Sequence, residues 1–362
     1  MKKLFFLFSL LSASHFCNAQ FVGFNSKEIS TLQQLIRTNT NVKSLTDKIT
    51  READAALHQA PNPIDTVVSE GHLSNDPKKI LTVASLADIN KIYALALQYR
   101  IAGKQIYLDA AIAFLSKWAI VNKPQGNPIN DTKFEPLFEA YDIIKESVPA
   151  KEKTAIENWL LAMADKELNN PRFASNKGVA VNNWNSHRIK TIGQIGYLLN
   201  NNTYKQFAKT AILKQVEINL YADGSGYDLK ERDALHYQVY TLEPLLELAI
   251  TIKRAEGIDD FNAVSATGSS IKKSIDFLQP FATGEKTHEE YVHSTVEFDR
   301  QRAANNEPGF KTGALFQPDQ ASYVFSLASF FNAAYVQVVQ KTTNNTYQFP
   351  NWQCVVSYLK KN

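Results

Sequence analysis

The sequence predicts an all-α protein built from stacked helical hairpins. Three observations lead to this fold class. Apolar residues recur every three or four positions along most of the 362-residue chain. Alternating strand patterns of useful length are missing from the sequence, apart from a possible one near residues 346–356. The connections between the periodic segments are short and polar, which favours antiparallel neighbouring helices.

The predicted helices follow one another from Ile29 onwards. The segment Lys104–Val121 shows the pattern clearly, with Ile106, Phe114 and Trp118 on one face. Gly103 is suited to end the preceding helix, because glycine readily adopts the left-handed backbone of a C-terminal cap. The other predicted helices are Ile29–Leu57 (one or two), Ala84–Tyr99, Phe134–Ile144, Lys151–Met163, His187–Leu199, Tyr204–Leu220, Leu235–Ile252, Ile271–Phe277, Ala321–Val339 and Trp352–Leu359.

Residues 1–19 have the features of a cleaved export signal. A basic start with Lys2 and Lys3 precedes the apolar run Leu4–Leu11, and Ala19 offers a small residue at the cleavage point. The apolar run is too short to span a membrane. We therefore predict a periplasmic or secreted protein, with one domain over residues 20–362 beginning at Gln20.

Charge and cysteine content exclude several classes of protein. The formal net charge of +3 falls to +1 when Lys2 and Lys3 leave with the signal. A general nucleic-acid binder needs a marked positive excess, so no nucleic-acid partner is expected. The chain after residue 19 keeps one cysteine, Cys354, which rules out an internal disulfide and a cysteine-rich metal site. His288, Glu289 and His293 match no specific metal-binding spacing.

Two long polar stretches are candidates for functional loops. Residues 59–76 are rich in Pro, Asn and Asp, and residues 283–320 carry many charges. Loops of this length in a compact domain are more often functional than accidental.

A first polar cluster, VNNWNSHR, spans Val181 to Arg188. If it begins a helix, Asn183 and His187 lie four residues apart on one face, away from the packing stripe that contains Ile192. An amide and an imidazole in this arrangement can hold a sugar carboxylate and stabilise the charge that develops on it. The alternative is that the asparagines cap the helix and the histidine makes a hydrogen bond in the core. Further along, Gly193 and Gly196 would let a neighbouring helix approach closely.

A second cluster follows a glycine-rich turn in the stretch YADGSGYDLKERDALHYQVYTLEPLL, residues 221–246. Asp233 is a plausible helix N-cap, which would put Arg232 at the mouth of the helix. Tyr237 and Tyr240 fall off the expected packing face and could line a cleft, although tyrosines also often bridge core and surface. Pro244 makes a continuous helix through this segment uncertain.

Several motifs together resemble a known family. The stretches ADINKIYALALQYRIAGKQIYLDAAIAFLSKWA, AYDII, NNWNSHR, RDALHYQVYTLEPL and VEFDRQRAA are similar, in this order, to the alginate lyase domain family of polysaccharide lyases. The resemblance covers roughly residues 80–335. It implies an (α/α) toroid, or incomplete barrel, with a positively lined groove. It also implies cleavage of a polyuronate by β-elimination, with no cofactor and no obligatory metal.

The resemblance also implies a set of site residues. Tyr237, His187, Asn183 and Arg232 would be catalytic, with Asn182 and Lys230 as alternatives to the last two. The expected substrate-binding residues are Asn182, Trp184, Arg188, His236, Tyr240 and Arg300. The expected partner is an anionic polysaccharide, and the expected protein is a monomer without a membrane span.

The predicted chemistry is proton removal beside a neutralised carboxylate. Asn183 and Arg232 would hold the carboxylate, Tyr237 or His187 would remove the C5 proton, and Tyr237 would protonate the leaving oxygen. Polymannuronate-rich alginate is the favoured substrate, and polyglucuronate is the alternative. A glycan-binding protein without catalysis, or a glycoside hydrolase that uses two of Asp228, Glu231 and Asp233, is less favoured.

Overall fold

The computed structural model describes residues 20–362, so the predicted export signal over residues 1–19 lies outside the described part. Helices make up its architecture, and the only strand-like pairings among the described residues are two isolated bridges, Leu220 with Gly226 and Glu289 with Leu315. The prediction of an all-α protein is confirmed.

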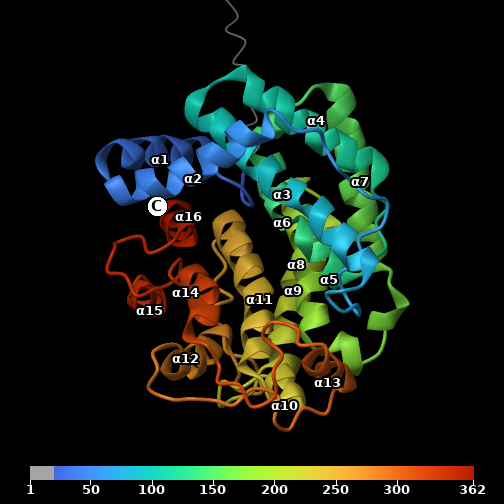
Figure 1. The fold of residues 1–362 in the computed structure, drawn as a ribbon, viewed down its shortest axis with the longest axis vertical. Helices are drawn as coiled ribbons and strands as arrows, with labels where there is room; N and C mark the ends of the chain where they lie inside the picture. The colour runs from blue at the N-terminus through green and yellow to red at the C-terminus, as the bar shows by residue number, and fades with distance from the viewer. Residues whose placement is uncertain (1–19) are drawn as a thin grey trace, which may run out of the picture.

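The helices are arranged as a ring (Figure 1). The α-helices are α1 (Ser26–Thr38), α2 (Thr40–Ala56), α3 (Pro77–Ala102), α4 (Gln105–Val121), α5 (Pro128–Asp131), α6 (Glu135–Ile144), α7 (Ala150–Leu168), α8 (Asn183–Leu198), α9 (Asn202–Asn219), α10 (Tyr227–Arg232), α11 (Leu235–Glu256), α12 (Ile271–Ala282), α13 (Glu297–Ala304), α14 (Ser322–Ala328), α15 (Tyr335–Thr342) and α16 (Trp352–Lys361). Short 3₁₀ turns are η1 (Thr132–Phe134), η2 (Lys145–Ser147), η3 (Pro171–Phe173), η4 (Gly178–Ala180) and η5 (Pro318–Ala321).

An inner layer and an outer layer of helices form the ring. Inner helices α3, α6, α8, α11, α14 and α16 each contact the next. Outer helices pack on them in hairpins, among them α2 and α4 on α3, α9 on α8, and α15 on α14. The last helix, α16, contacts α1 and α2, so the two ends of the chain meet and close the ring (Figure 1). This is the toroidal arrangement that the family resemblance implied.

Helix α8 is almost entirely buried. The sequence predicted one apolar stripe on this helix, but nearly all of its residues are buried. The expected close approach at its glycines is present, because a Cβ on Gly193 would lie 2.5 Å from Leu248 of α11 and 2.8 Å from Ala208 of α9. A Cβ on Gly196 would likewise meet Tyr204 at 2.8 Å. These two glycines let α9 and α11 flank α8 closely.

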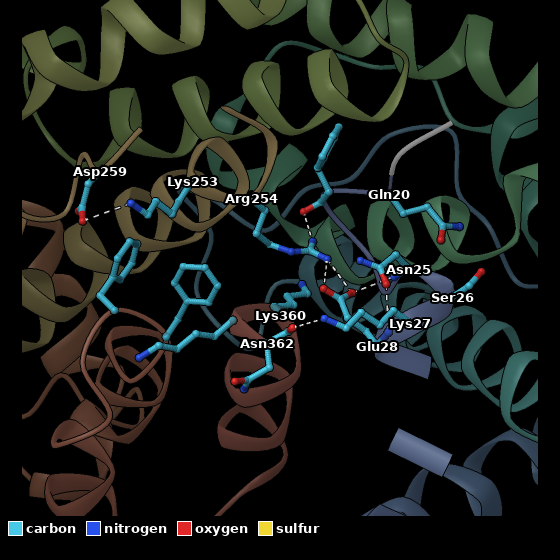
Figure 2. A pocket seen from close by; sticks show the side chains of 14 residues that line it. Gln20, Asn25, Ser26, Lys27, Glu28, Lys253, Arg254, Asp259, Lys360 and Asn362 are labelled. Atoms are coloured by element: carbon cyan, nitrogen blue, oxygen red, sulfur yellow. Dashed lines mark hydrogen bonds and ion pairs between the residues drawn. The ribbon is translucent and has the colours of Figure 1, made fainter. Parts of the chain in front are cut away.

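The N-terminal segment before α1 joins parts of the ring that are distant in sequence. The backbone N–H groups of Val22 and Gly23 donate to the Asp142 carboxylate of α6, each at 2.9 Å. Arg254, near the end of α11, forms a two-pronged ion pair with Glu28 at 2.6 and 2.7 Å. The Arg254–Glu28 pair borders a hollow of about 810 Å³ at the junction of the two chain ends (Figure 2).

Several predicted elements differ in the structure. The helix predicted over residues 321–339 is split into α14 and α15, because the Asn332 side chain accepts from the Ala334 N–H and starts a new turn between them. The possible strand near residues 346–356 is wrong, since α16 begins at Trp352. Pro244 lies inside an uninterrupted α11.

Asp233 is not the N-cap that the sequence predicted. It adopts left-handed backbone (φ 47°) and ends α10, while Ala234 precedes α11. Its carbonyl oxygen accepts from the Tyr291 N–H at 2.6 Å and its carboxylate accepts from the His293 N–H at 2.8 Å. The turn between α10 and α11 is therefore bound to the loop of residues 283–317.

Helix α3 is the one described helix that is long and apolar enough to cross a membrane. Half of its most apolar stretch is buried inside the protein, where α3 packs against α2, α4 and α6. The core helix of a soluble protein passes the same test of length and composition.

Candidate functional site

A cleft of about 620 Å³ contains most of the residues that the sequence singled out. The first half of α3 and the segment around η1 form one wall, and α10, α11 and α13 form the other. The start of α8 lies between them. Among its lining residues are Lys79, Val83, Asn90, Lys133, Asn183, Trp184, Arg232, His236, Tyr237, Tyr240, Arg302 and Phe310.

Asn183 is oriented by a buried carboxylate. Its backbone N–H donates to Asp228 Oδ1 at 3.1 Å, and its side-chain amide donates to the same oxygen. The other oxygen of Asp228 accepts from Asn219 at 2.9 Å and from Thr241 at 2.8 Å. Asp228 is fully buried, so it holds α8, α9, α10 and α11 together and aims the Asn183 amide at the cleft. The neighbouring Asn182 caps α8 by accepting from the Trp184 N–H at 3.0 Å.

His187 lies directly beneath the cleft and is fully buried. Its Nδ1 is 2.9 Å from the Thr132 hydroxyl of η1, and its ring centre is 4.3 Å from that of Tyr240. Burial lowers the pKa of His187 well below its ordinary value, and the positive charges of Lys190 and Lys133 lower it further. The imidazole is therefore neutral, and it supports the ring of Tyr240 from below.

Tyr237 lies between two arginines. The Arg232 guanidinium is 4.0 Å from the centre of its ring, and Arg302 donates to its hydroxyl oxygen at 2.7 Å. Burial raises the pKa of Tyr237, while both arginines oppose that rise. Asp299 of α13 accepts from Arg232 at 2.6 Å, so the charge of Arg232 is already balanced inside the protein.

Tyr240 and His236 lie on the exposed side of α11. Tyr240 lines both the cleft and an adjoining hollow of about 460 Å³, and its hydroxyl has no hydrogen-bond partner among residues 20–362. Burial, and then the charge of Glu243, raises the pKa of Tyr240. Burial, then Arg302 and Arg232, lowers the pKa of His236 to about 4. Near neutral pH both groups are uncharged.

Lys133 is a cation of the cleft that no motif in the sequence indicated. It follows Thr132 in η1, lines the cleft, and has no carboxylate at ion-pair distance within the described residues. Desolvation lowers its pKa against the opposing charge of Glu243, and Lys190 and Lys79 lower it further. It is thus available to meet a negative charge on a ligand.

Other predicted site residues lie elsewhere. Arg188 points away from the cleft and donates to the carbonyl oxygens of Glu167 at 2.8 Å and Leu168 at 3.0 Å. Arg300 is exposed on α13 and pairs with Glu297. Lys230 stacks on Tyr221, with its Nζ 3.8 Å from the ring centre. Arg302, two residues after Arg300, is the α13 arginine that enters the cleft.

The two long loops predicted to be functional meet beside the cleft. The Ser74 N–H donates to Glu307 at 2.5 Å, and the Asn75 amide donates to Asn305 at 3.2 Å. Phe310 of the second loop lines the cleft and packs near His236, with ring centres 5.5 Å apart. The segment containing α13 thus covers one side of the cleft.

The cleft is poor in acidic side chains. Glu70 is the one carboxylate that lines the 620 Å³ cleft in the described chain. Within residues 20–362, no three His, Cys, Asp or Glu side chains gather into a group that could hold a metal ion.

Comparison with known proteins identifies the family of the chain. The family of alginate lyases matches residues 37–288 of the chain. No curated protein sequence matches the chain significantly.

Solved structures share the fold. An alginate lyase from Bacteroides ovatus has a TM-score of 0.69 at 16% identity, covering 95% of this chain and 99% of that chain. Alginate lyase A1-III from Sphingomonas species A1 has a TM-score of 0.56 at 18% identity, covering 84% of this chain and 94% of that chain. A tyrosine-to-phenylalanine variant of A1-III complexed with tetrasaccharide has a TM-score of 0.56 at 18% identity, covering 74% of this chain and 78% of that chain. At these identities the likeness is one of fold.

Proposed function

The chain belongs to the alginate lyase family and is a polysaccharide lyase, and on this premise we propose that it cleaves a polyuronate by β-elimination in the 620 Å³ cleft. Polymannuronate-rich alginate is the favoured substrate, in keeping with the family. The observation that carries the proposal is the composition of the cleft. It combines an oriented amide, an unpaired lysine and two tyrosines, and it has a single carboxylate, Glu70.

The first step is binding of the substrate carboxylate at the base of the cleft. The Asn183 amide keeps one N–H free after its bond to Asp228, and Lys133 supplies a positive charge. Together they neutralise the carboxylate and stabilise the extra negative charge that develops when the C5 proton leaves. Arg232, which the sequence suggested for this role, is held by Asp299 and acts on Tyr237 instead.

The second step is proton transfer between the two tyrosines and the sugar. Burial raises the pKa of Tyr237, but Arg232 and Arg302 oppose that rise and its oxygen already accepts from Arg302. We therefore assign Tyr237 to take the C5 proton as a tyrosinate that the two arginines stabilise. The electrons of the C5–H bond form the C4=C5 double bond as the C4–O4 bond breaks. Tyr240 stays protonated because its pKa is raised, and it donates its proton to O4. A proton then passes from Tyr237 to Tyr240, so both tyrosines regain their starting states and no net proton is consumed.

The rival chemistry of glycoside hydrolysis receives less support. It requires two carboxyl groups that flank the scissile bond. Asp228 is fully buried and accepts four hydrogen bonds, and Glu231 and Asp233 do not line the cleft. A binding protein without catalysis would not need the arginine-supported tyrosine.

The test is an assay of the purified chain against polymannuronate, polyguluronate and polyglucuronate. Elimination creates a conjugated double bond that absorbs in the ultraviolet, while hydrolysis creates reducing ends without it. We expect absorbance to rise with polymannuronate. A rise with polyglucuronate alone would make the chain a glucuronan lyase, and new reducing ends without absorbance would replace elimination by hydrolysis.

Export of the protein remains a prediction from its first residues. Expression in a Gram-negative host should yield a periplasmic or secreted chain that begins at Gln20, read by N-terminal sequencing. A chain that retains Met1 in the cytoplasm would refute it.

A further inference from the structure

Two buried carboxyl groups beside the cleft face each other with no donor group between them. Asp131 is 3% exposed and Glu167 is fully buried. They lie within hydrogen-bonding reach of each other. Three of their carboxyl oxygens, both of Glu167 and Oδ2 of Asp131, accept no hydrogen bond from a donor group among the described residues. Two ionised carboxylates cannot remain in contact in such a place, so a proton must lie between them.

Asp131 is attached directly to the wall of the cleft. It is the last residue of α5 and precedes Thr132 and Lys133 of η1. Thr132 holds His187 Nδ1 at 2.9 Å, and Lys133 lines the cleft. A displacement of Asp131 would therefore move both groups.

Glu167 anchors the other side of the same support. It lies in the last turn of α7, and its backbone carbonyl oxygen accepts from Arg188, the residue after His187 on α8. A second N–H of Arg188 reaches the Leu168 carbonyl oxygen. The carboxyl pair thus joins η1 to the end of α7, and α7 in turn holds α8 beside His187.

The proton of the pair resides mainly on Glu167. Burial raises the pKa of both groups, and the charge of Asp131 raises that of Glu167 further, to about 10. The N–H groups of Gly126 and Asn127 favour the charged form of Asp131, whereas Arg188 is the one cation that opposes the rise at Glu167. At neutral pH the pair therefore binds η1 to α7 through one shared proton.

We propose that Asp131 and Glu167 share one proton and act as a positioning pair, which keeps Thr132, His187 and Lys133 in the geometry that the elimination requires. When that proton is lost, the two like charges repel and η1 separates from α7. The kinetic consequence rests on the proposed function, whereas the effect on stability does not.

The sign of the stability effect follows from linkage. The unfolded chain releases the Glu167 proton near its ordinary pKa of 4.5, but the folded protein keeps it to about 10. Across this range the folded state binds more protons, so the pair's contribution to stability falls as the pH rises. A neutral amide at position 167 removes the titrating proton and still donates a hydrogen bond to Asp131.

The experiment compares Glu167→Gln and Glu167→Leu with the parent protein between pH 6 and pH 10. Glu152→Gln is the matched control, because it makes the same change on the same helix away from the pair. Thermal unfolding is measured first and needs no substrate. We expect the melting temperature of Glu167→Gln to fall less with rising pH than those of the parent and of Glu152→Gln.

Steady-state kinetics on the cleaved polyuronate supply the second readout. Glu167→Leu should lose about tenfold or more in kcat at pH 7, because small misplacements of catalytic groups have large costs. Glu167→Gln should keep kcat at pH 7 and extend activity to higher pH. If the melting temperatures of Glu167→Gln and the parent fell equally with rising pH, the proposal of a shared proton would be overturned. A Glu167→Leu variant with parental kcat would overturn the positioning role.

Discussion

At the scale of single residues, the two cleft tyrosines differ in what surrounds their hydroxyl groups. Tyr237 is bound by Arg302 and stacked by Arg232, whereas the Tyr240 hydroxyl is free and its ring rests on His187. Burial raises the pKa of both tyrosines, but at Tyr237 two arginines oppose that rise, whereas at Tyr240 the charge of Glu243 adds to it. This difference divides the base and acid roles between residues only three positions apart on α11.

The division predicts that neither tyrosine can replace the other. Tyr237→Phe and Tyr240→Phe should each lower kcat by about 10²- to 10⁴-fold, the usual contribution of a general acid or base, without change in the melting temperature. Tyr227→Phe, on the neighbouring α10 and outside the cleft lining, is the control. Full activity in Tyr237→Phe with an inactive Tyr240→Phe would assign both proton transfers to Tyr240.

Lys133 should determine affinity for the substrate carboxylate. Lys133→Met is expected to lower kcat/KM by about 10- to 100-fold, since a hydrogen bond to a charged group contributes about 1.5–3 kcal/mol. Lys133→Arg should retain most of the parental kcat/KM. Because the pKa of Lys133 is lowered, kcat/KM should fall as the pH rises through it, and the arginine variant should lack that fall. Lys117→Met, at an exposed position on α4, is the control, and a Lys133→Met variant that matches it would contradict the assignment.

The neutral His236 predicts a loss of stability on the acid side. Its pKa is about 4 in the folded protein against an ordinary 6.5, so the unfolded chain binds more protons between these values. The free energy of unfolding should therefore fall as the pH drops from 6.5 towards 4. In urea titrations, the free energy of unfolding of His236→Gln should fall less between pH 6.5 and pH 4 than that of the parent. His58→Gln, at an exposed position, should behave as the parent does, and parallel curves for all three proteins would be incompatible with a buried neutral His236.

At the scale of elements, periodicity in the sequence predicted the long helices because their apolar faces pack on neighbours in the ring. It missed α10 and α13, which are short and polar, and it missed the split between α14 and α15, where the Asn332 side chain accepts from the Ala334 N–H in the turn between them. Asp233 was misassigned for a related reason: its left-handed backbone is held by the loop of residues 283–317, which is distant in sequence.

The same distinction applies to the candidate site. Asn183, Tyr237 and Tyr240 could be named because they stand in dense local motifs, and the structure brings them to one cleft. Lys133 and Arg302 could not be chosen over Lys230 and Arg300, because only the folded chain shows which cation enters the cleft. The role of Asp228 depends on donors from three other helices, which no local pattern reveals.

The turn before α10 depends on one close contact. Gly224 has φ 89°, and a Cβ there would lie 2.5 Å from the Lys273 carbonyl oxygen of α12. Gly257, after α11, has φ 74° but open space around it. Gly257→Ala should cost about 1–3 kcal/mol from backbone strain alone. Gly224→Ala should cost more in urea unfolding, and should also reduce activity by moving α10. Equal costs for the two variants would show that the turn can shift away from α12.

At the scale of the whole molecule, the cleft depends on a closed ring. The catalytic walls come from α3 on one side and α11 on the other, and the chain ends meet between these helices on the far side of the ring (Figure 1). There α16 packs on α1 and α2. Arg254 of α11 reaches Glu28 of α1 and the carbonyl oxygen of Gly23, as Figure 2 shows for the Glu28 pair.

The Arg254–Glu28 ion pair should therefore control the stability of the entire ring. Both side chains are nearly buried, at 5% and 6% exposure, so Arg254→Met leaves an uncompensated carboxylate. Loss of one partner of such a pair costs about 3–5 kcal/mol, while replacement of both by neutral groups costs much less. Arg254→Met should thus unfold at markedly lower urea concentration, and Arg254→Met combined with Glu28→Gln should recover most of the loss. Glutamine at position 28 still completes the capping box with Asn25, so the cap of α1 is retained in the double variant. If the double variant were as unstable as Arg254→Met, the contacts of Arg254 with the N-terminal backbone, rather than its charge on Glu28, would be what closes the ring.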